Sequence, residues 1–116
     1  MADRNEDNFS VRFRNASTDL ERIKLAIKEN RYTIWARSDK PNCSEEYLSP
    51  ILNLPARHSV KRSPRISVGE GFDYVIELKY LFQMRGKNIP IYLKGYFSKE
   101  GHLVIGFEVQ SLRRND

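Results

Sequence analysis

The sequence predicts an α+β fold in which an N-terminal helix packs on a C-terminal three-stranded antiparallel meander sheet, with room for further short strands in the N-terminal half. Two patterns carry this prediction. Residues 19–29 place apolar side chains at helical spacing, and residues 72–110 alternate apolar and polar side chains through segments joined by glycine-containing turns. A chain of 116 residues, 40% of them hydrophobic, can bury one core, so we expect a single domain over residues 9–116.

Composition excludes several classes of protein. No uncharged apolar run approaches the roughly 20 residues that a membrane span needs, so we expect no membrane partner. Residues 1–8 are polar, and we expect them to be disordered rather than to form a secretory signal. Cys43 is the single cysteine, which excludes an internal disulfide and fits a cytoplasmic location. Because Cys43 has no partner at ligand spacing and the two histidines are far apart, we expect no metal and no cofactor.

The helix at 19–29 has a clear start and end. Thr18 is followed three residues later by Glu21, the spacing of a capping box, and Asn30 is suited to close the helix in the left-handed conformation. One stripe of this helix is apolar, formed by Leu20, Ile23, Ala26 and Ile27. The stripe is the expected cover for the apolar face of the sheet.

The other segments of the N-terminal half are shorter. FSVRFR at 9–14 alternates like a short strand or an extended lead-in, and RYTIWAR at 31–37 is rich in strand-forming residues. Residues 44–54 start like a capped helix but contain Pro50, which favours a short or two-piece helix. Residues 55–71 hold prolines and glycines without a sustained period, so we expect one long loop.

Strands are expected from Phe72 onward. RGKN at 85–88 is predicted to be the first turn, and KEG at 99–101 a three-residue hairpin loop with glycine in the left-handed position. With the first turn at Gly86–Lys87, Lys79 would lie opposite Lys94. With Ser98 opposite His102 in the second hairpin, Tyr92 would lie opposite Glu108 and Lys94 opposite Gly106. Both registers keep the apolar residues on one side of the sheet.

The other side of this predicted sheet is rich in ionisable groups. Lys79, Tyr92, Lys94 and Glu108 share it, and we expect them to form a candidate catalytic site, with Glu77, Tyr96 and His102 around them. A solvated ladder of Lys, Glu and Tyr is the simpler interpretation. The alternative is an RNA site, in which lysines hold phosphate, tyrosines stack on a base or donate a proton, and Glu108 or His102 is the general base of a metal-independent cleavage.

A basic cluster lies in the expected loop. No acidic residue occurs between Glu46 and Glu70, and the formal net charge of the chain is +5. Such a cluster is either a solvated connection or a contact for a polyanion, because each neutralised phosphate releases counterions. The candidate RNA-binding residues are therefore Arg57, His58, Lys61, Arg62 and Arg65 of the loop, together with Tyr96 and His102 of the sheet.

The strand IYLKGYF followed by HLVIGFE resembles the C-terminal half of MqsR-type messenger-RNA interferases, which belong to the RelE-like group of small ribonuclease toxins. The resemblance covers residues 72–110 and implies a cofactor-free endoribonuclease held inactive by a protein antitoxin. Tyr92 and Lys94 match the Tyr-x-Lys strand of the family, and Phe107 matches the aromatic residue of its last strand. Glu108 stands where the family usually has Lys or His, so Lys79 or a loop arginine would have to supply the cation. Gln83 and Lys79 correspond by position to an upstream Gln and Lys.

A second function stays open at this stage. The chain could be a non-enzymatic interaction protein, namely an immunity protein, an adaptor or a nucleic-acid-binding accessory factor. Trp35 or the tyrosines would then supply the strongest contacts. The salt dependence of binding separates a nucleic-acid partner from a protein partner, because phosphate contacts weaken steeply with salt and a protein interface does not.

Overall fold

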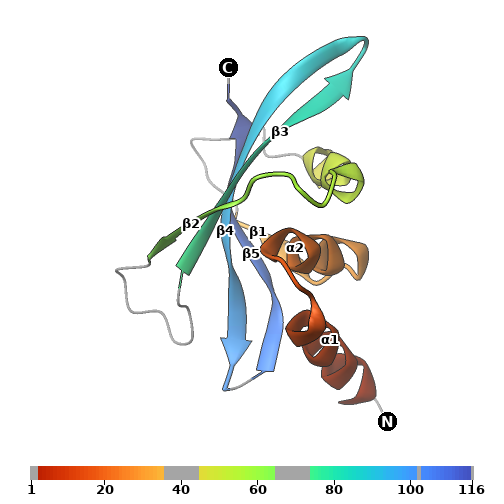
Figure 1. The fold of residues 1–116 in the computed structure, drawn as a ribbon, viewed down its shortest axis with the longest axis vertical. Helices are drawn as coiled ribbons and strands as arrows, with labels where there is room; N and C mark the ends of the chain where they lie inside the picture. The colour runs from red at the N-terminus through yellow and green to blue at the C-terminus, as the bar shows by residue number, and fades with distance from the viewer. Residues whose placement is uncertain (1–2, 36–44, 65–73, 102, 116) are drawn as a thin grey trace.

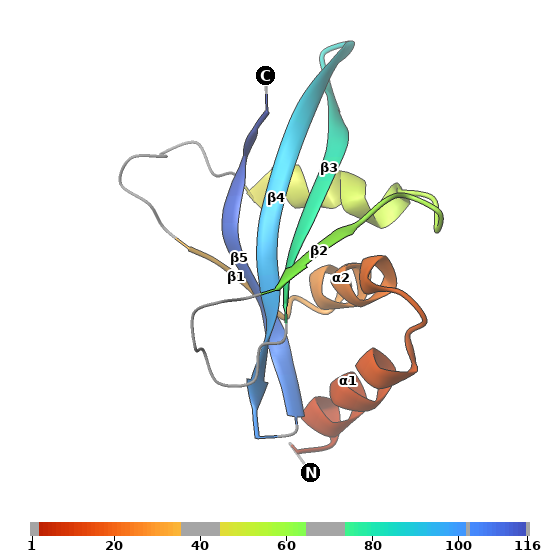
Figure 2. The ribbon, with the colours of Figure 1, turned by 60° about the vertical axis from the view of Figure 1, so that its left-hand side comes forward.

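The computed structural model describes residues 3–35, 45–64, 74–101 and 103–115. They form one five-stranded sheet in the order β1-β5-β4-β3-β2, with the helical elements gathered on one side of it (Figures 1 and 2). The helical elements are α1 (Asp3–Asn15), α2 (Asp19–Lys28) and the 3-10 helix η1 (Glu45–Asn53). The strands are β1 (Tyr32–Ile34), β2 (Lys61–Pro64), β3 (Tyr74–Met84), β4 (Lys87–Glu100) and β5 (Leu103–Arg114).

The predicted α+β class and the helix-on-sheet packing are confirmed, but the sheet has five strands rather than the three of the predicted meander, and one of the added strands, β1, lies in the strand-forming segment 31–37. β3, β4 and β5 form the expected antiparallel meander. β1 adds to β5 in parallel, and β2 adds to β3 antiparallel, so the sheet is mixed. β2 arises inside the segment 55–71 that was expected to be entirely loop. The short helix expected over 44–54 is present as η1, with Pro50 inside it.

The strand or extended lead-in expected over residues 9–14 is wrong, because these residues belong to α1. The helix also begins at Asp3, within the segment that was expected to be disordered. Phe9 and Phe13 are 0% and 9% exposed, whereas Val11 between them is 43% exposed. A strand would have placed all three side chains on one face, but a helix brings only the residues four apart together.

α2 agrees with its predicted start and end. The Thr18 hydroxyl accepts the Glu21 amide at 3.1 Å, and the Glu21 carboxylate in turn accepts the Ser17 amide at 3.0 Å. The first bond satisfies an amide that the first helical turn leaves without a partner, and the second fixes the residue that precedes the N-cap. Asn30 has a φ of 58°, which ends the helix in the left-handed conformation, as predicted.

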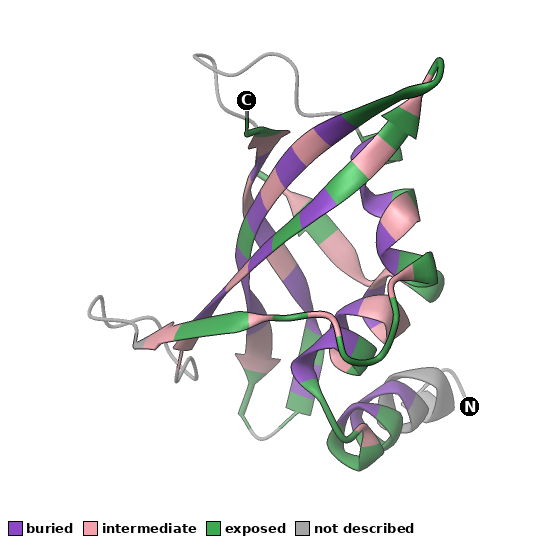
Figure 3. Cartoon of the chain, turned by 45° about the horizontal axis from the view of Figure 1, so that its top comes forward, coloured by how far each residue is buried: buried purple, intermediate pink, exposed green. Residues whose placement is uncertain are grey.

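The core lies between the helices and one face of the sheet. Buried and exposed positions alternate along β3 and β4, as Figure 3 shows. The fully buried residues come from every layer, so the sheet face and the helices enclose one core. The largest of them are Phe9, Phe107, Leu20, Ile23, Leu48, Ile51, Ile76, Leu78, Ile91, Leu93, Leu112 and Val109.

The hairpin of β3 and β4 turns one residue earlier than predicted. Met84 pairs with Lys87, and the two turn residues Arg85 and Gly86 have φ angles of 52° and 78°. Positive φ at both positions is the signature of the turn type that follows the twist of a two-stranded hairpin. The predicted pairing of Lys79 with Lys94 is therefore wrong. Lys79 lies opposite Tyr92, and the expected repulsion between two lysines does not arise.

The second hairpin also differs from the prediction. Its strands extend to Glu100 and Leu103, which pair, and Gly101 has the expected positive φ of 63°. This later turn moves the pairing along both strands, and register shifts after Lys94 and after Ser98 move it further. Tyr92 consequently lies opposite Arg113 rather than Glu108, Lys94 opposite Ser111, and Ser98 opposite Gly106, while Glu108 lies opposite Tyr96.

Gly95, beside the first of these shifts, is held in a crowded place. A Cβ atom there would come within 2.9 Å of the Phe107 ring and closer still to the Glu108 carbonyl oxygen. Only glycine permits β4 and β5 to approach each other in this way.

One buried carboxylate joins three elements on the helix side. Asp19, 8% exposed at the start of α2, accepts Arg22 at 3.1 Å, Arg62 of β2 at 2.6 and 3.0 Å, and the Tyr74 hydroxyl of β3 at 3.0 Å. The Arg62 guanidinium also lies 4.1 Å from the centre of the Tyr74 ring. Burial raises the pKa of Asp19, but the hydrogen bonds from Arg62, Tyr74 and Arg22 outweigh it, and the pKa lies below its ordinary value.

Replacing Asp19 tests this connection. Asp19→Asn should lower the free energy of unfolding by about 1–3 kcal/mol at neutral pH, because Arg62 and Arg22 lose their anionic partner. A lowered folded-state pKa stabilises the fold above the unfolded pKa of about 3.9 and loses that effect as pH falls through the folded pKa. The difference between wild type and variant in urea denaturation should therefore shrink in acid. Glu46→Gln, at an exposed position of η1, is the control and should change stability by less than about 0.5 kcal/mol.

The turn residue Arg85 gives a second test. Asn accepts positive φ more readily than Arg, so Arg85→Asn should raise the free energy of unfolding by about 0.5–1 kcal/mol. Lys87→Asn, placed after the turn in β4, should give no such gain. Equal effects of the two substitutions in urea denaturation would contradict the assigned turn.

Candidate nucleic-acid interface

The sheet face that points away from the helices, here called the outer face, carries the predicted catalytic residues. Along β3, Lys79 lies between the buried residues Leu78 and Tyr80, so it points to the opposite side. Tyr92 and Lys94 likewise alternate with core residues of β4. Glu108 lies between core residues of β5. All four predicted catalytic side chains therefore share the outer face.

The register arranges the cations of this face around one carboxylate. Lys61 of β2 and Lys94 of β4 both lie opposite Glu77 of β3. In the next row across the sheet, Tyr92 lies between Lys79 and Arg113. We call Lys61, Lys79, Lys94 and Arg113 the basic patch. Its three lysines are exposed. Opposite charges face each other across the strands, which favours this register.

Tyr92 and Glu77 form the centre of the basic patch. The Tyr92 hydroxyl donates to Glu77 Oε2 at 2.7 Å, and Ser63 Oγ lies 3.3 Å from Glu77 Oε1. The Arg113 guanidinium lies 4.7 Å from the centre of the Tyr92 ring. The hydrogen bond from Tyr92 lowers the pKa of Glu77. Burial and the bond to Glu77 raise the pKa of Tyr92 to about 12. At neutral pH the pair is thus a carboxylate and a protonated phenol.

A second group lies farther along the outer face. Trp35 Nε1 donates to Glu108 Oε1 at 3.1 Å, and the Trp35 and Tyr96 rings meet edge to face with centres 6.0 Å apart. We call Trp35, Tyr96 and Glu108 the aromatic cluster. Trp35 is 39% exposed, whereas Tyr96 is 6% exposed. The indole is therefore the aromatic surface of this cluster that a ligand can reach.

The predicted catalytic residues do not form one group. Tyr92 and Tyr96 are four positions apart on β4, which corresponds to roughly 13 Å along a strand. Lys79, Tyr92 and Lys94 surround Glu77, while Glu108 belongs to the aromatic cluster. The prediction that Glu108 and Tyr92 lie opposite each other is therefore wrong, because the hairpin turns later than predicted and shifts its register after Ser98, which brings Glu108 opposite Tyr96.

The residues predicted to bind RNA through the basic loop are also divided. Lys61 joins the basic patch on the outer face. His58 Nε2 lies 2.7 Å from the Lys79 carbonyl oxygen, at the edge of the sheet, and Arg57 beside it is exposed. Arg62 points to the helix side, where Asp19 holds it.

Two of the predicted RNA-binding residues, Arg65 and His102, lie outside the residues that the structure describes. Sequence reasoning also gave no site role to Glu77 and left Arg113 unmentioned. Glu77 had been placed on the correct face, but its central position depends on the register. Arg113 was missed because the last strand was expected to end near residue 110, whereas β5 continues to Arg114.

No three His, Cys, Asp or Glu side chains within 3–35, 45–64, 74–101 and 103–115 lie together as a metal-binding group. None of the helices in these ranges is both long and apolar enough to span a membrane.

Comparison of the chain with family models, with curated proteins and with solved structures found no match.

The bond between Tyr92 and Glu77 can be tested by titration. Tyr92→Phe removes the hydroxyl donor and should raise the pKa of Glu77 towards its ordinary value. Ser63→Ala removes a weaker contact of the same carboxylate and should raise the pKa less. Side-chain carboxyl NMR shifts followed against pH measure both values. An unchanged Glu77 pKa in Tyr92→Phe would show that the hydrogen bond does not form in solution.

Proposed function

We propose that this chain binds single-stranded RNA along the outer face, with phosphates on the basic patch and a base on Trp35 of the aromatic cluster. The observation that carries the proposal is the arrangement of the patch: cations from β2, β3, β4 and β5 are brought to adjacent positions on one face. None of these strands supplies the patch by itself.

The basic patch is suited to phosphate. Its three lysines are exposed and free to turn towards a ligand, while Glu77 neutralises only part of the charge and is itself engaged by Tyr92 and Ser63. Arg113 offers a planar guanidinium, which binds phosphate oxygens in a bidentate manner. Each phosphate that the patch neutralises releases counterions, so binding should weaken strongly as salt rises.

The aromatic cluster is suited to an unpaired base. A partly exposed indole gives a flat surface for stacking, and the hydrogen bond to Glu108 and the edge-to-face contact with Tyr96 keep that indole in place. Bases are accessible for such stacking in single strands, because in a duplex they are stacked on one another. Tyr92 and Tyr96 are separated by roughly 13 Å along β4. The backbone of the bound RNA would span this distance and contact both the basic patch and the aromatic cluster.

RNA cleavage is the narrower form of this proposal. Glu77, rather than Glu108, would take the proton of a 2′-hydroxyl, the 2′-oxygen would attack the phosphorus, and the P–O5′ bond would break as Lys94 gives its proton to the leaving oxygen. The products would be a 2′,3′-cyclic phosphate and a 5′-hydroxyl. The lowered pKa of Glu77 makes it a weak base, so binding is the better supported form.

A salt titration tests phosphate binding. The affinity for a labelled single-stranded RNA is measured at several salt concentrations. Lys94→Ala and Arg113→Ala should each make the negative slope of log affinity against log salt shallower by about 0.7. Lys28→Ala, an exposed cation at the end of α2, changes the net charge of the chain equally and should leave the slope unaltered. Equal effects in all three variants, or a flat response in the wild type, would contradict binding at the patch.

The same titrations report on the base and on cleavage. Trp35 is the single tryptophan of the chain, so stacking should quench its fluorescence directly. Trp35→Ala should weaken binding by about 1–3 kcal/mol, with Trp35→Phe closer to wild type. Cleavage is supported if RNA incubated with the wild type is recovered with 2′,3′-cyclic phosphate ends while RNA incubated with Glu77→Gln stays intact. Intact RNA with both proteins would contradict cleavage and support only the binding form of the proposal.

A further inference from the structure

β3 has an open edge beside η1. β2 pairs with β3 only from Tyr74 to Glu77, and in the described parts of the chain no other strand pairs with β3 on that side. The section from Leu78 to Met84 therefore forms the border of the sheet. Figures 1 and 3 show β3 continuing past the end of β2 to the tip of the hairpin. An open strand edge offers a row of amide and carbonyl groups for pairing.

Three observations determine which residues turn these groups outwards. Met84 and Lys87 close a two-residue turn, so they form a hydrogen-bonded pair, and every second residue back along β3 also bonds to β4. Leu81 lies opposite Pro90, which has no amide hydrogen to give it. The Lys79 carbonyl points outwards, because it lies 2.7 Å from His58 Nε2. Lys79, Leu81 and Gln83 thus direct their backbone groups to the open edge.

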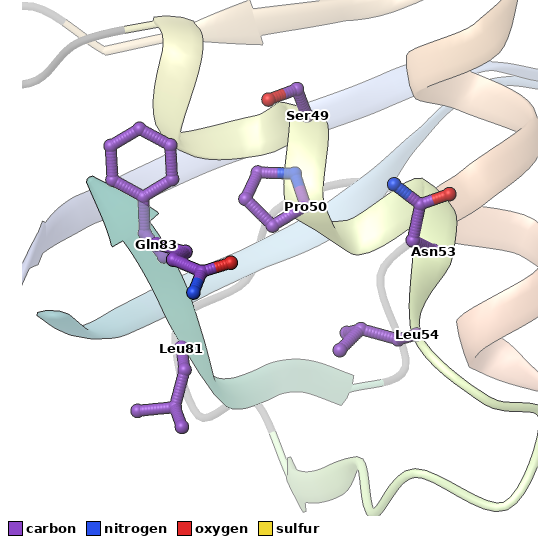
Figure 4. A pocket seen from close by; sticks show the side chains of 7 residues that line it. Ser49, Pro50, Asn53, Leu54, Leu81 and Gln83 are labelled. Carbon is purple, nitrogen blue, oxygen red and sulfur yellow. The ribbon is translucent and has the colours of Figure 1, made fainter. Parts of the chain in front are cut away.

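A groove runs along this edge. It has a volume of about 440 Å³ and lies between the end of β3 and η1, as Figure 4 shows. Leu81, which lies on the outer face beside Lys79, is 57% exposed, the largest exposure among the large hydrophobic side chains of the described residues. The groove contains no charged side chain and is lined by Ser49, Pro50, Asn53, Leu54, Leu81, Phe82 and Gln83.

The charges along the edge indicate what it would accept. The charged side chains along the open edge are cations. Lys79 lies within the edge, and Arg85 and Lys87 lie at its hairpin end. At the opposite end of the edge, Arg57 lies next to His58. Glu77, where β2 ends, is already engaged by Tyr92. An extended segment with acidic side chains on the outer side complements these cations. A second copy of the chain, which carries the same +5 charge, would bring like charges together.

We propose that the open edge of β3 binds an extended acidic segment of a protein partner as an added strand. Its backbone pairs with Leu81, with Gln83 and with the amide of Lys79, whose carbonyl is already bonded to His58. Its acidic side chains lie beside Lys79 on the outer face, and its apolar side chains enter the groove towards Phe82 and Leu54. Backbone pairing supplies the affinity of such a contact, and the alternate side chains supply its specificity. This surface is separate from the aromatic cluster, and it shares only Lys79 with the basic patch.

A short peptide in which Glu alternates with Val is the probe. It should bind and slow the hydrogen exchange of the Lys79, Leu81 and Gln83 amides, measured residue by residue by NMR. Leu81→Pro removes an outward amide without removing a bond to β4, and should weaken peptide binding by roughly tenfold or more. The matched control peptide alternates Lys with Val and should bind more weakly. Lys79→Glu should reverse this preference.

RNA binding separates this proposal from the previous one. Leu81→Pro should retain the RNA affinity of the wild type, since Leu81 belongs to neither the basic patch nor the aromatic cluster. If Leu81→Pro lowers the melting temperature, Gln83→Pro, nearer the end of the strand, replaces it in the same experiment. Peptide binding without protection of the three amides, equal binding of both peptides, or no peptide binding would overturn the proposal. A dimer in sedimentation that Leu81→Pro abolishes would overturn the choice of partner in favour of a second copy.

Discussion

The two-residue turn at Arg85 and Gly86 is the constraint on which the rest of this structure depends. It fixes the closing pair of β3 and β4, and through that pair it fixes every neighbour along this hairpin. Had the turn formed one residue later, the pairing would have moved by two positions. The same side chains would still have faced away from the helices, but Lys79 would have met Lys94, and Glu77 would have kept only Lys61 of its two flanking lysines.

This register gives the two sides of the sheet different tasks. The helix side is apolar and is closed by α1, α2 and η1, so it provides stability. The buried carboxylate of Asp19 on this side is satisfied by partners from α2, β2 and β3 and holds β2 against the helices. The outer face has no such cover in the described chain. Its ionisable groups are arranged by the pairing alone, which is why the basic patch draws on several strands.

The short length of β2 has consequences for both proposed surfaces. Where β2 is present, it brings Lys61 beside Glu77 and completes the basic patch. Beyond Glu77, β3 keeps its outward backbone groups open and forms one wall of the groove with η1. RNA binding would use the face of the sheet, and an added strand would use its edge. Lys79 lies where the two meet, so an acidic segment on the edge would reduce the charge available to phosphate.

The sequence by itself determined the features that depend on near neighbours along the chain. Those features are α2 with its Thr18 cap, the alternation of β3–β5, and the face to which Lys79, Tyr92, Lys94 and Glu108 belong, because a period of two survives a register error of two residues. Only the tertiary structure decided α1. Its alternating Phe9, Val11 and Phe13 are compatible with a strand and with a helix, and the helix is formed because packing buries the two phenylalanines and leaves Val11 exposed. The tertiary structure likewise decided β2 and the pairing of Tyr92 with Glu77. These features rest on contacts between segments far apart in the sequence, which no local pattern encodes.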